Sequence, residues 1–513
     1  MTNSVRKRFA FTVGANLLRS TLSFVTGMLL ARSLGPLSFG NMAFLLGTFV
    51  AIRQILDMGS STAFYTFMSQ RRQSKRFVIS FFGWLGVQFL VPLCVVGLLF
   101  PSQWIEFVWR GEPRGLVLVA FAAAFMQNSL WPVVQQFGES RRQTLWVQSV
   151  GVAIVATHLL AMVLLWSLGM LGLYAIFAAI AVEYVSAAIV MFIWLPNRAP
   201  AETTTPDVPR HVLRMFLRYC RPLVPYAWIG FAYEFADRWL LQTYGGSVQQ
   251  AYYAVSAQFA GIALIATSSI LNIFWKEIAE AHFKGDHARA HMLYRRVSRS
   301  LFLVGAIVAG YLSPWVKELL QLILSAAYVG GASTLVIMFL YPIHQSMGQI
   351  GGTMLYATER VTLQVVIGIV FMVVSMGVTY LVLAPANAAV PGLGLASEGL
   401  AIKMVGLQII QANIIAYIIA RIWNWRFDWV YQPVSIIGCL ALGWLAHRMA
   451  IDIASRSWPV PAVMALGAAL YLMLTAAFVY VMPWLTGSTR TEFLVEANLL
   501  WRRTLMGSGR YGS

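Results

Sequence analysis

The sequence predicts an all-α membrane protein with about 14 transmembrane helices. Its composition is 59% hydrophobic and 11% charged, whereas a soluble domain carries about 25% charged residues. Apolar stretches of about 20 residues, the length that an α-helix needs to cross a hydrocarbon core of roughly 30 Å, recur along nearly the whole chain. Lys and Arg collect in alternate gaps between these stretches, which is typical of a polytopic protein with basic cytoplasmic loops.

The apolar stretches follow one another with one marked interruption. The expected spans are 9–31, 41–67, 77–100, 115–137, 143–168, 170–195, 219–243, 251–275, 299–323, 331–357, 361–384, 393–420, 432–450 and 459–482. The sixth and seventh are separated by the most polar internal segment of the chain, which is rich in proline. The sequence therefore predicts an N-terminal set of six spans in 1–196, a cytoplasmic linker in 197–218 and a second set of six in 219–420. An extra pair of spans follows in 421–482, and then a cytoplasmic amphipathic tail in 483–513.

The basic residues fix the expected orientation. With the N-terminus in the cytoplasm, 27 of the 37 Lys and Arg residues fall in cytoplasmic segments and six on the opposite side. Both termini are therefore expected in the cytoplasm. The net charge of +18 would suggest nucleic acid in a soluble protein. Here topology and anionic lipid headgroups explain it, so no nucleic-acid partner is expected. The largest loop, Lys276 to Arg299, is expected to form an amphipathic cytoplasmic helix.

Several charged side chains fall inside the predicted spans. A charge at bilayer depth costs several kcal/mol, so such residues normally face a protein interior or a water-filled cavity. The residues are the bases Arg19, Arg53, Arg238 and Lys403 and the acids Asp57, Glu183, Glu234, Asp237 and Glu398. Arg53 and Asp57 are four residues apart and can pair on one helix face. Arg19 and Lys403 have no obvious partner on their own helices, and we expect them to face a hydrated route.

Polar residues recur at helical spacing in several spans, which supports a cavity. The stripes are Thr12, Asn16, Arg19, Ser23 and Thr26; Asn128, Trp131 and Gln135; Tyr226, Tyr233, Glu234, Asp237 and Arg238; and Gln345, Gln349, Gly352 and Tyr356. Each stripe has a structural alternative, because polar and small residues also join membrane helices to one another.

The sequence contains no motif that indicates an enzyme. The chain has no Walker A sequence, no GxSxG and no cluster of metal-ligand residues. Its three cysteines, Cys94, Cys220 and Cys439, are isolated in or beside apolar segments. We therefore predict no catalytic residue, metal site or cofactor.

Four segments carry a resemblance to a known family. Ala31–Gly40 resembles the A-R-x-L-G-P-x-x-F-G loop of polysaccharide transporters, and Asp57–Gly59 resembles the D-x-G segment of their second span. Ala236–Leu241 resembles their A-D-R-x-L-L motif, and Lys284–Asp286 is similar to their cytoplasmic segment between spans 8 and 9. These are the polysaccharide transporter family of the multidrug/oligosaccharidyl-lipid/polysaccharide (MOP) exporter superfamily, which includes flippases of the Wzx type. Gln249–Tyr253 departs from the usual residues of its loop, which leaves the substrate subclass open.

The resemblance implies two pseudo-symmetric six-helix lobes around a central cavity that opens to either side in turn. It also implies a flippase for polyprenyl-diphosphate-linked oligosaccharide repeat units in the bacterial inner membrane. Arginine and lysine would meet the diphosphate, while aromatic and amide side chains would bind the sugar. The expected substrate-binding residues are Arg19, Arg53, Arg238, Lys403, Trp131, Gln135, Tyr226, Tyr233, Gln349 and Tyr356, with Arg19 and Lys403 bridging the diphosphate. Asp57, Glu234 and Asp237 are candidates for coupling to protons or sodium, and structural roles are open for them.

Two other functions compete with this interpretation. A multidrug/cation antiporter of the MATE type would prefer an acidic, aromatic cavity. A membrane glycosyltransferase or polymerase would need a catalytic loop, and none is visible in the sequence. A flippase would have a lipid-linked oligosaccharide and membrane lipids as its partners, together with the polysaccharide polymerase and export machinery. The sequence leaves open the glycan, the carrier length, the coupling ion and the oligomeric state.

Overall fold

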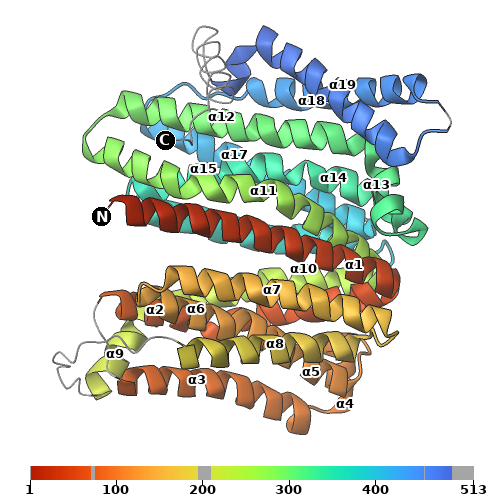
Figure 1. The fold of residues 1–513 in the computed structure, drawn as a ribbon. Coiled ribbons are helices and arrows are strands. Elements are labelled where there is room, and N and C mark those ends of the chain that lie inside the picture. The colour runs from red at the N-terminus through yellow and green to blue at the C-terminus, as the bar shows by residue number, and fades with distance from the viewer. Residues whose placement is uncertain (1, 71–74, 195–208, 456, 488–513) are drawn as a thin grey trace, which may run out of the picture. The chain divides into compact units, whose positions relative to one another are not determined.

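The structure, a computed structural model, describes residues 2–70, 75–194, 209–455 and 457–487 (Figure 1). These residues form helices and connecting turns and contain no strand. The chain divides into two compact units. Unit 1 comprises the described residues within 1–258, 323–331 and 369–403, and unit 2 comprises those within 259–322, 332–368 and 404–513. The expected all-α fold is confirmed.

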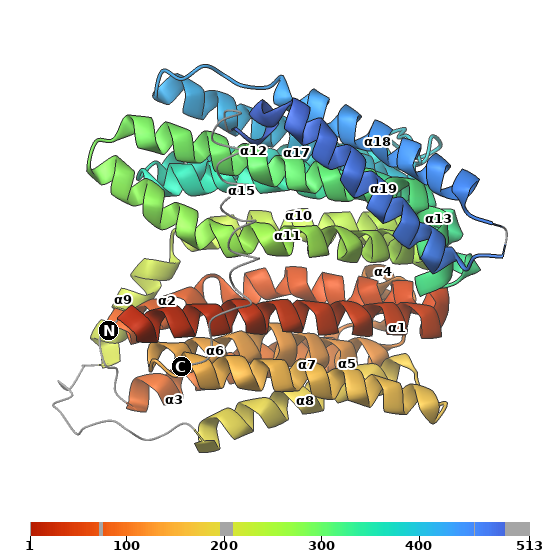
Figure 2. The same ribbon diagram turned by 45° about the horizontal axis from the view of Figure 1, so that its top comes forward.

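The helices of unit 1 are mostly N-terminal. They are α1 (Thr2–Asp57), α2 (Ser60–Gln70), α3 (Lys75–Cys94), η1 (Val95–Leu99), α4 (Ser102–Trp109), α5 (Arg114–Phe125), η2 (Met126–Leu130), α6 (Trp131–Ser140), α7 (Thr144–Ser167), α8 (Leu173–Trp194), α9 (Pro209–Cys220), α10 (Leu223–Tyr244) and η4 (Ala326–Gly331). Within this unit α1 packs against α7 and α10, while α8 packs against α5 and α7. The two views show α1, α7 and α8 side by side (Figures 1 and 2).

The helices of unit 2 come from the C-terminal half. They are α12 (His287–Leu312), η3 (Ser313–Trp315), α13 (Val316–Ile323), α14 (Ala332–Phe339), α15 (Tyr341–Ala357), α18 (Tyr431–Ile453), α19 (Val460–Val481) and η5 (Pro483–Thr486). Three further helices have residues in both units: α11 (Gly246–Phe283), α16 (Val361–Leu383) and α17 (Ala396–Ile422). The last residue of α13, Ile323, also belongs to unit 1. In unit 2, α12 packs against α15 and α18, and α18 packs against α19.

Each of the fourteen predicted spans falls on helical residues, although their boundaries differ. The first two spans lie in α1, whose helical geometry breaks at Gly35 (φ 72°, ψ 171°) just before Pro36. A positive φ of this kind suits glycine, which has no Cβ to clash. Among the described residues, eleven segments are long and apolar enough to cross a membrane. This count treats α1 as one segment, although two predicted spans lie in it. It leaves out α10, which carries three charges, and α11. The number of fourteen spans therefore stays a prediction.

The connection between α11 and α12 differs from the expected separate amphipathic helix. Both helices extend into it, and α12 begins at His287 after a short turn in which Gly285 has φ 68°. The Asp286 carboxylate accepts a hydrogen bond from the Arg289 backbone N–H at 2.9 Å and so caps α12. Lys284 Nζ donates to Glu280 Oε1 at 2.6 Å, and this hydrogen bond lowers the pKa of the Glu280 carboxyl. The loop is therefore a helical hairpin that continues the two flanking helices.

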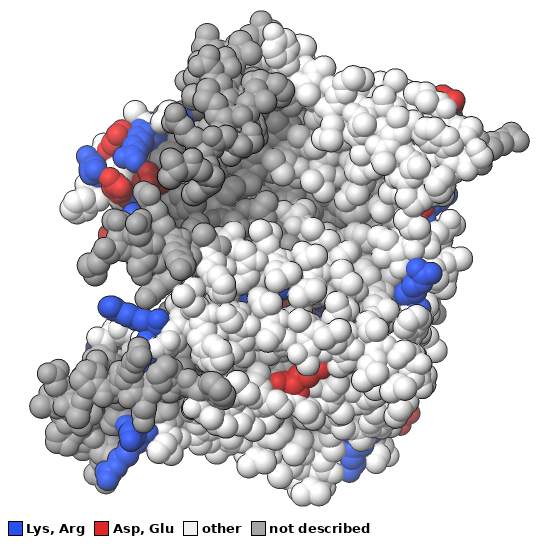
Figure 3. Space-filling view, in the orientation of Figure 1, with Lys and Arg blue, Asp and Glu red and all other residues white. Residues whose placement is uncertain are grey.

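Charged atoms are sparse on the face shown in Figure 3, where uncharged residues make up most of the visible surface. Many large apolar side chains are exposed, for example Leu98 at 79%, Ile193 at 72% and Leu472 at 62%. Such exposure is unusual for a protein in water but expected for helices that face lipid. The chain is a multi-pass membrane protein. The expected division into two six-span lobes at 197–218 and the cytoplasmic tail stay predictions, since residues 195–208 and 488–513 lie outside the described residues.

Candidate functional site

Helix α10 carries five of the predicted site residues, and four of them lie on two neighbouring faces of the helix. Tyr233 and Asp237 are four residues apart on one face, and Glu234 and Arg238 are four apart on the next. Both faces contact other helices of unit 1, so two neighbouring polar clusters form around one helix. The fifth predicted residue of α10, Tyr226, is 42% exposed and belongs to neither cluster.

The first cluster is a buried ion pair between Asp237 of α10 and Lys403 of α17. Lys403 Nζ donates to Asp237 Oδ1 at 2.8 Å and to Oδ2 at 2.7 Å. The Thr379 hydroxyl of α16 donates to Asp237 Oδ1 at 2.7 Å, and the Lys403 ammonium lies 4.9 Å from the centre of the Tyr233 ring. Lys403 is 3% exposed and Asp237 8%. The sequence shows no partner for Lys403 on its own helix, and the structure supplies one from another helix, α10.

The second cluster surrounds Glu234. Gln54 of α1 hydrogen-bonds to the Glu234 carboxylate. Arg238 and Arg53 attract this carboxylate electrostatically, and Asp237 of the first cluster repels it. The Arg238 guanidinium carbon also lies 5.4 Å from the centre of the Tyr253 ring. All four polar residues are partly buried. Two arginines thus share one carboxylate between α1 and α10, which leaves a net positive charge in this cluster.

Asp57 has a structural role that the sequence did not show. Its carboxylate accepts hydrogen bonds at 2.9 Å from the Ser60 hydroxyl, the Ser61 hydroxyl and the Ser61 backbone N–H. These bonds satisfy the start of α2. Among the ion pairs of the described residues, none joins Asp57 to Arg53, so the expected pair within one helix is not formed. Arg53 instead contributes to the Glu234 cluster.

A third cluster brings three predicted residues together in the N-terminal helices. Arg19 of α1 donates to Asn16. When the Gln135 amide oxygen is oriented toward them, it accepts from Arg19 Nη1 at 3.3 Å and from Trp131 Nε1 at 3.1 Å. Glu139 interacts electrostatically with Arg19. Arg19 is therefore hydrogen-bonded by neutral groups, and it interacts electrostatically with an acid on α6.

Unit 2 contains a cavity of about 400 Å³ that holds the remaining two predicted residues, Gln349 and Tyr356. Its lining has five glutamines and no Asp, Glu, Lys, Arg or His. The lining residues are Leu271, Trp275, Gln345, Gly348, Gln349, Gly352, Thr353, Tyr356, Gln364, Gln408, Gln411 and Ile415. They come from α11, α15, α16 and α17. The site is thus rich in amides and uncharged.

We call this site the glutamine cavity. Its lining includes aromatic rings and amide oxygens that have no hydrogen-bond partner, and both can bind a ligand. The rings of Trp275 and Tyr356 are parallel, with centroids 5.8 Å apart and an interplanar angle of 4°. Their side chains are 45% and 37% exposed. The buried Oε1 atoms of Gln349 and Gln364 have no hydrogen-bond partner among the described residues. An unpaired buried amide oxygen is costly, so a ligand hydroxyl that donates to it would bind favourably.

Most of the glutamine cavity could not be assigned from the sequence. Gln345 and Gln349 belong to a stripe visible in the sequence, but Trp275, Gln364, Gln408 and Gln411 were not expected there. Gln408 and Gln411 are three residues apart in an otherwise apolar stretch, and that spacing is the signal that indicates a polar helix face. Among the described residues, no group of three or more His, Cys, Asp or Glu is placed to hold a metal ion.

Comparisons with known proteins agree with this architecture. The profile of a family described as "Polysaccharide biosynthesis protein" matches residues 5–274. No curated protein matches the chain. A structure of the lipid II flippase MurJ in an inward closed conformation aligns with 92% of this chain and 99% of its own, at a TM-score of 0.69 and 12% identity.

Structures of other MOP superfamily transporters, one of which is a multidrug resistance MATE family transporter, align with lower TM-scores. An inward-facing member of the MOP superfamily has a TM-score of 0.57 and 14% identity and covers 79% of this chain and 96% of its own. A MOP superfamily transporter from Pyrococcus furiosus has a TM-score of 0.51 and 13% identity, covering 81% of this chain and 95% of its own. At these identities the structures establish a shared fold.

Proposed function

Since this chain belongs to the polysaccharide biosynthesis protein family, we propose that it is a flippase for polyprenyl-diphosphate-linked oligosaccharides. In this account it moves repeat units from the inner to the outer leaflet of the bacterial inner membrane, for surface or exopolysaccharide assembly. Both termini lie in the cytoplasm, and the translocated unit passes to a polysaccharide polymerase and export machinery. Transport proceeds by alternating access, with no covalent chemistry on the substrate.

The glutamine cavity is the observation that carries the proposal. A primary amide offers two donors and an acceptor with two lone pairs, which matches a sugar hydroxyl that both donates and accepts. The Trp275 and Tyr356 rings supply flat apolar surfaces of the kind on which the C–H face of a sugar packs. The lining has no charge. A neutral saccharide therefore fits this cavity better than an ion does.

The same cavity argues against the antiporter of cationic drugs. A cation that leaves water needs a compensating negative charge, because an unpaired charge in a low-dielectric site is costly. The glutamine cavity has no acid in its lining. In unit 1, Asp237 is neutralised by Lys403 and Asp57 is engaged with α2. Glu234 is the third candidate coupling acid, and two arginines lie near its carboxylate. Since the other two acids already have partners, Glu234 is the residue that we propose for ion coupling.

The diphosphate needs cationic side chains, and three of the four predicted basic residues are available to bind it. Arg19, Arg53 and Arg238 lie in unit 1 without an acid of their own within ion-pair distance among the described residues. Arginine suits phosphate because it offers paired donors. Lys403 is excluded from this role in our account, since both of its short contacts are with Asp237. The lipid tail stays in the bilayer.

A transport assay with two substrates tests the proposal. The purified protein is placed in liposomes that carry a polyprenyl-diphosphate-linked oligosaccharide, and a glycosidase outside the vesicles reports how much glycan becomes accessible. A parallel set follows efflux of a cationic dye under a proton or sodium gradient. We expect glycan translocation above protein-free liposomes and no dye transport. Dye efflux without glycan translocation would support the antiporter and refute the flippase.

A further inference from the structure

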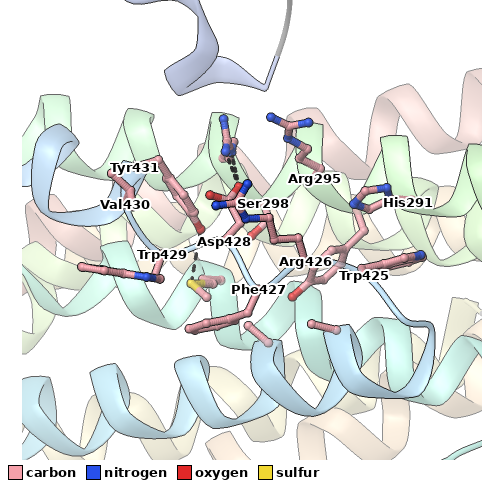
Figure 4. A pocket seen from close by; sticks show the side chains of 15 residues that line it. His291, Arg295, Ser298, Trp425, Arg426, Phe427, Asp428, Trp429, Val430 and Tyr431 are labelled. Carbon is pink, nitrogen blue, oxygen red and sulfur yellow. Dashed lines mark hydrogen bonds and ion pairs between the residues drawn. The ribbon is translucent and has the colours of Figure 1, made fainter.

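Unit 2 contains a second cavity, of about 500 Å³, that shares no residue with the glutamine cavity. It lies between α12, α15, α17 and the connection from α17 to α18. Figure 4 shows residues 425–431 of that connection together with His291, Arg295 and Ser298 of α12. None of the expected substrate-binding residues lines it. Its basic residues belong to segments that the sequence places on the cytoplasmic side.

The charges of this cavity are unbalanced. Its lining includes Arg295, Arg299 and Arg426 but only one acid, Asp428. Arg299 is 4% exposed and is held by an ion pair with Asp428 and by a hydrogen bond to the Trp484 carbonyl. Arg295 and Arg426 are exposed, and neither forms an ion pair with another described residue. Two guanidinium groups are therefore available to a ligand.

The remaining lining offers polar atoms and an aromatic wall. The Trp425 and His291 rings stack with centroids 4.4 Å apart, and Tyr294 lies 6.0 Å from Trp425. The buried Tyr294 hydroxyl has no hydrogen-bond partner within the described part of the chain. A ligand with several acceptor oxygens would satisfy both this hydroxyl and the guanidinium donors. The cavity volume lies in the range of small-molecule sites, roughly 300–1,000 Å³.

We propose that this cavity binds the phosphate group of an anionic membrane lipid. Guanidinium groups match phosphate oxygens in pairs. Basic pockets between membrane helices on the cytoplasmic side bind acidic headgroups. Trp425 and Trp429 beside the cavity suit the interfacial region, where tryptophan is enriched. The site is independent of the proposed transport function, since it uses none of the residues assigned to the substrate. A soluble phosphate offers the same chemistry and is the other possible source of the ligand.

Thermal unfolding of the full-length protein in detergent tests the site. Phosphatidylglycerol, phosphatidylcholine and inorganic phosphate are added separately, because a ligand that binds only the folded state raises Tm. The variant is Arg295→Gln with Arg426→Gln. Its control is Arg448→Gln, which removes one exposed arginine from the far half of α18. All three of these arginines are exposed, so we expect the double variant and the control without lipid to melt as the wild type does.

We expect phosphatidylglycerol, but not phosphatidylcholine, to raise the Tm of the wild type and the Arg448→Gln control by several degrees. The double variant should lose more than half of this shift, and each single variant should lose part of it. A similar arginine-dependent shift with inorganic phosphate would assign the site to soluble phosphate. Equal shifts in the double variant and the control would overturn the proposal, as would equal effects of the two lipids.

Discussion

Asp237 and Lys403 form a buried ion pair between α10 and α17, with both carboxylate oxygens within 2.8 Å of the ammonium nitrogen. The two residues are separated by 166 positions in the chain. Thr379 completes the environment of the carboxylate by donating to it. The pair therefore accounts for two of the charges in the apolar spans without any substrate, and it links three helices within unit 1.

Removing one partner of this pair should be more harmful than removing both. A lone charge left in a buried site costs about 3–5 kcal/mol, whereas replacing a whole buried pair by apolar residues is often nearly neutral. We expect Lys403→Met and Asp237→Leu each to lower Tm in detergent and the amount of protein in the membrane. The double variant should have a Tm and an amount of membrane protein close to those of the wild type. Strict additivity of the three Tm changes would show that the pair contributes no coupling.

Asp57 should behave as a helix cap with no coupling to Arg53. Asp57→Ala removes three hydrogen bonds at the start of α2 and should lower stability by about 0.5–2 kcal/mol. Asp57→Asn keeps an acceptor oxygen and should retain most of that stability. The change Arg53→Gln combined with Asp57→Asn should equal the sum of the singles in a chemical unfolding series. If the change in unfolding free energy of the double variant differed strongly from the sum of the singles, Arg53 and Asp57 would be paired as the sequence suggested.

The contact between α12 and α18 should depend on glycine. A Cβ on Gly443 would collide with the Gly310 carbonyl group, and backbone cannot move away as a flexible side chain can. Gly443→Ala should therefore destabilise unit 2 by about 1–3 kcal/mol, the usual cost of overpacking. The matched control is Gly406→Ala in α17, where a Cβ meets nothing within 4 Å. The control should be neutral or gain up to about 1 kcal/mol from helix propensity. Equal melting of the two variants would rule out a close crossing.

The helices were predictable from the sequence because apolar length and loop charge are local properties. The partners of the buried charges were not, because they depend on which helices become neighbours. Lys403 has no acid one turn away, and its partner comes from α10. Gln364 of α16 and Gln411 of α17 line the same cavity. The spacing of polar residues within one span cannot predict that two spans will meet there. Asp57 lies four residues from Arg53, yet the serines that follow it in the chain satisfy its carboxylate.

The predicted topology can be tested by labelling with a membrane-impermeant thiol reagent. Cys94, Cys220 and Cys439 are first replaced by Ser. A cysteine at Thr204 in the central linker should stay unlabelled in intact cells, because the distribution of basic residues places the linker in the cytoplasm. A cysteine at Ser457, between α18 and α19, should react and serves as the control. The reverse pattern would invert the orientation.

We propose that the glutamine cavity of unit 2 binds the glycan of the substrate. Gln349 and Gln411 line it from α15 and α17, and the Gln349 amide oxygen is buried without a partner among the described residues. Each lost hydrogen bond is worth about 0.5–1.5 kcal/mol, so removing two should cost about 1–3 kcal/mol, or roughly 5- to 150-fold in transport. The control is Gln321→Leu, an exposed glutamine of α13 outside the cavity.

The direct measurement is the rate at which liposomes containing each protein expose the lipid-linked oligosaccharide to external glycosidase, at equal amounts of folded protein. We expect the combined change Gln349→Leu and Gln411→Leu to lower this rate at least about 5-fold, while the Gln321→Leu protein transports as the wild type does. Equal rates for the cavity variant, the control and the wild type would contradict it.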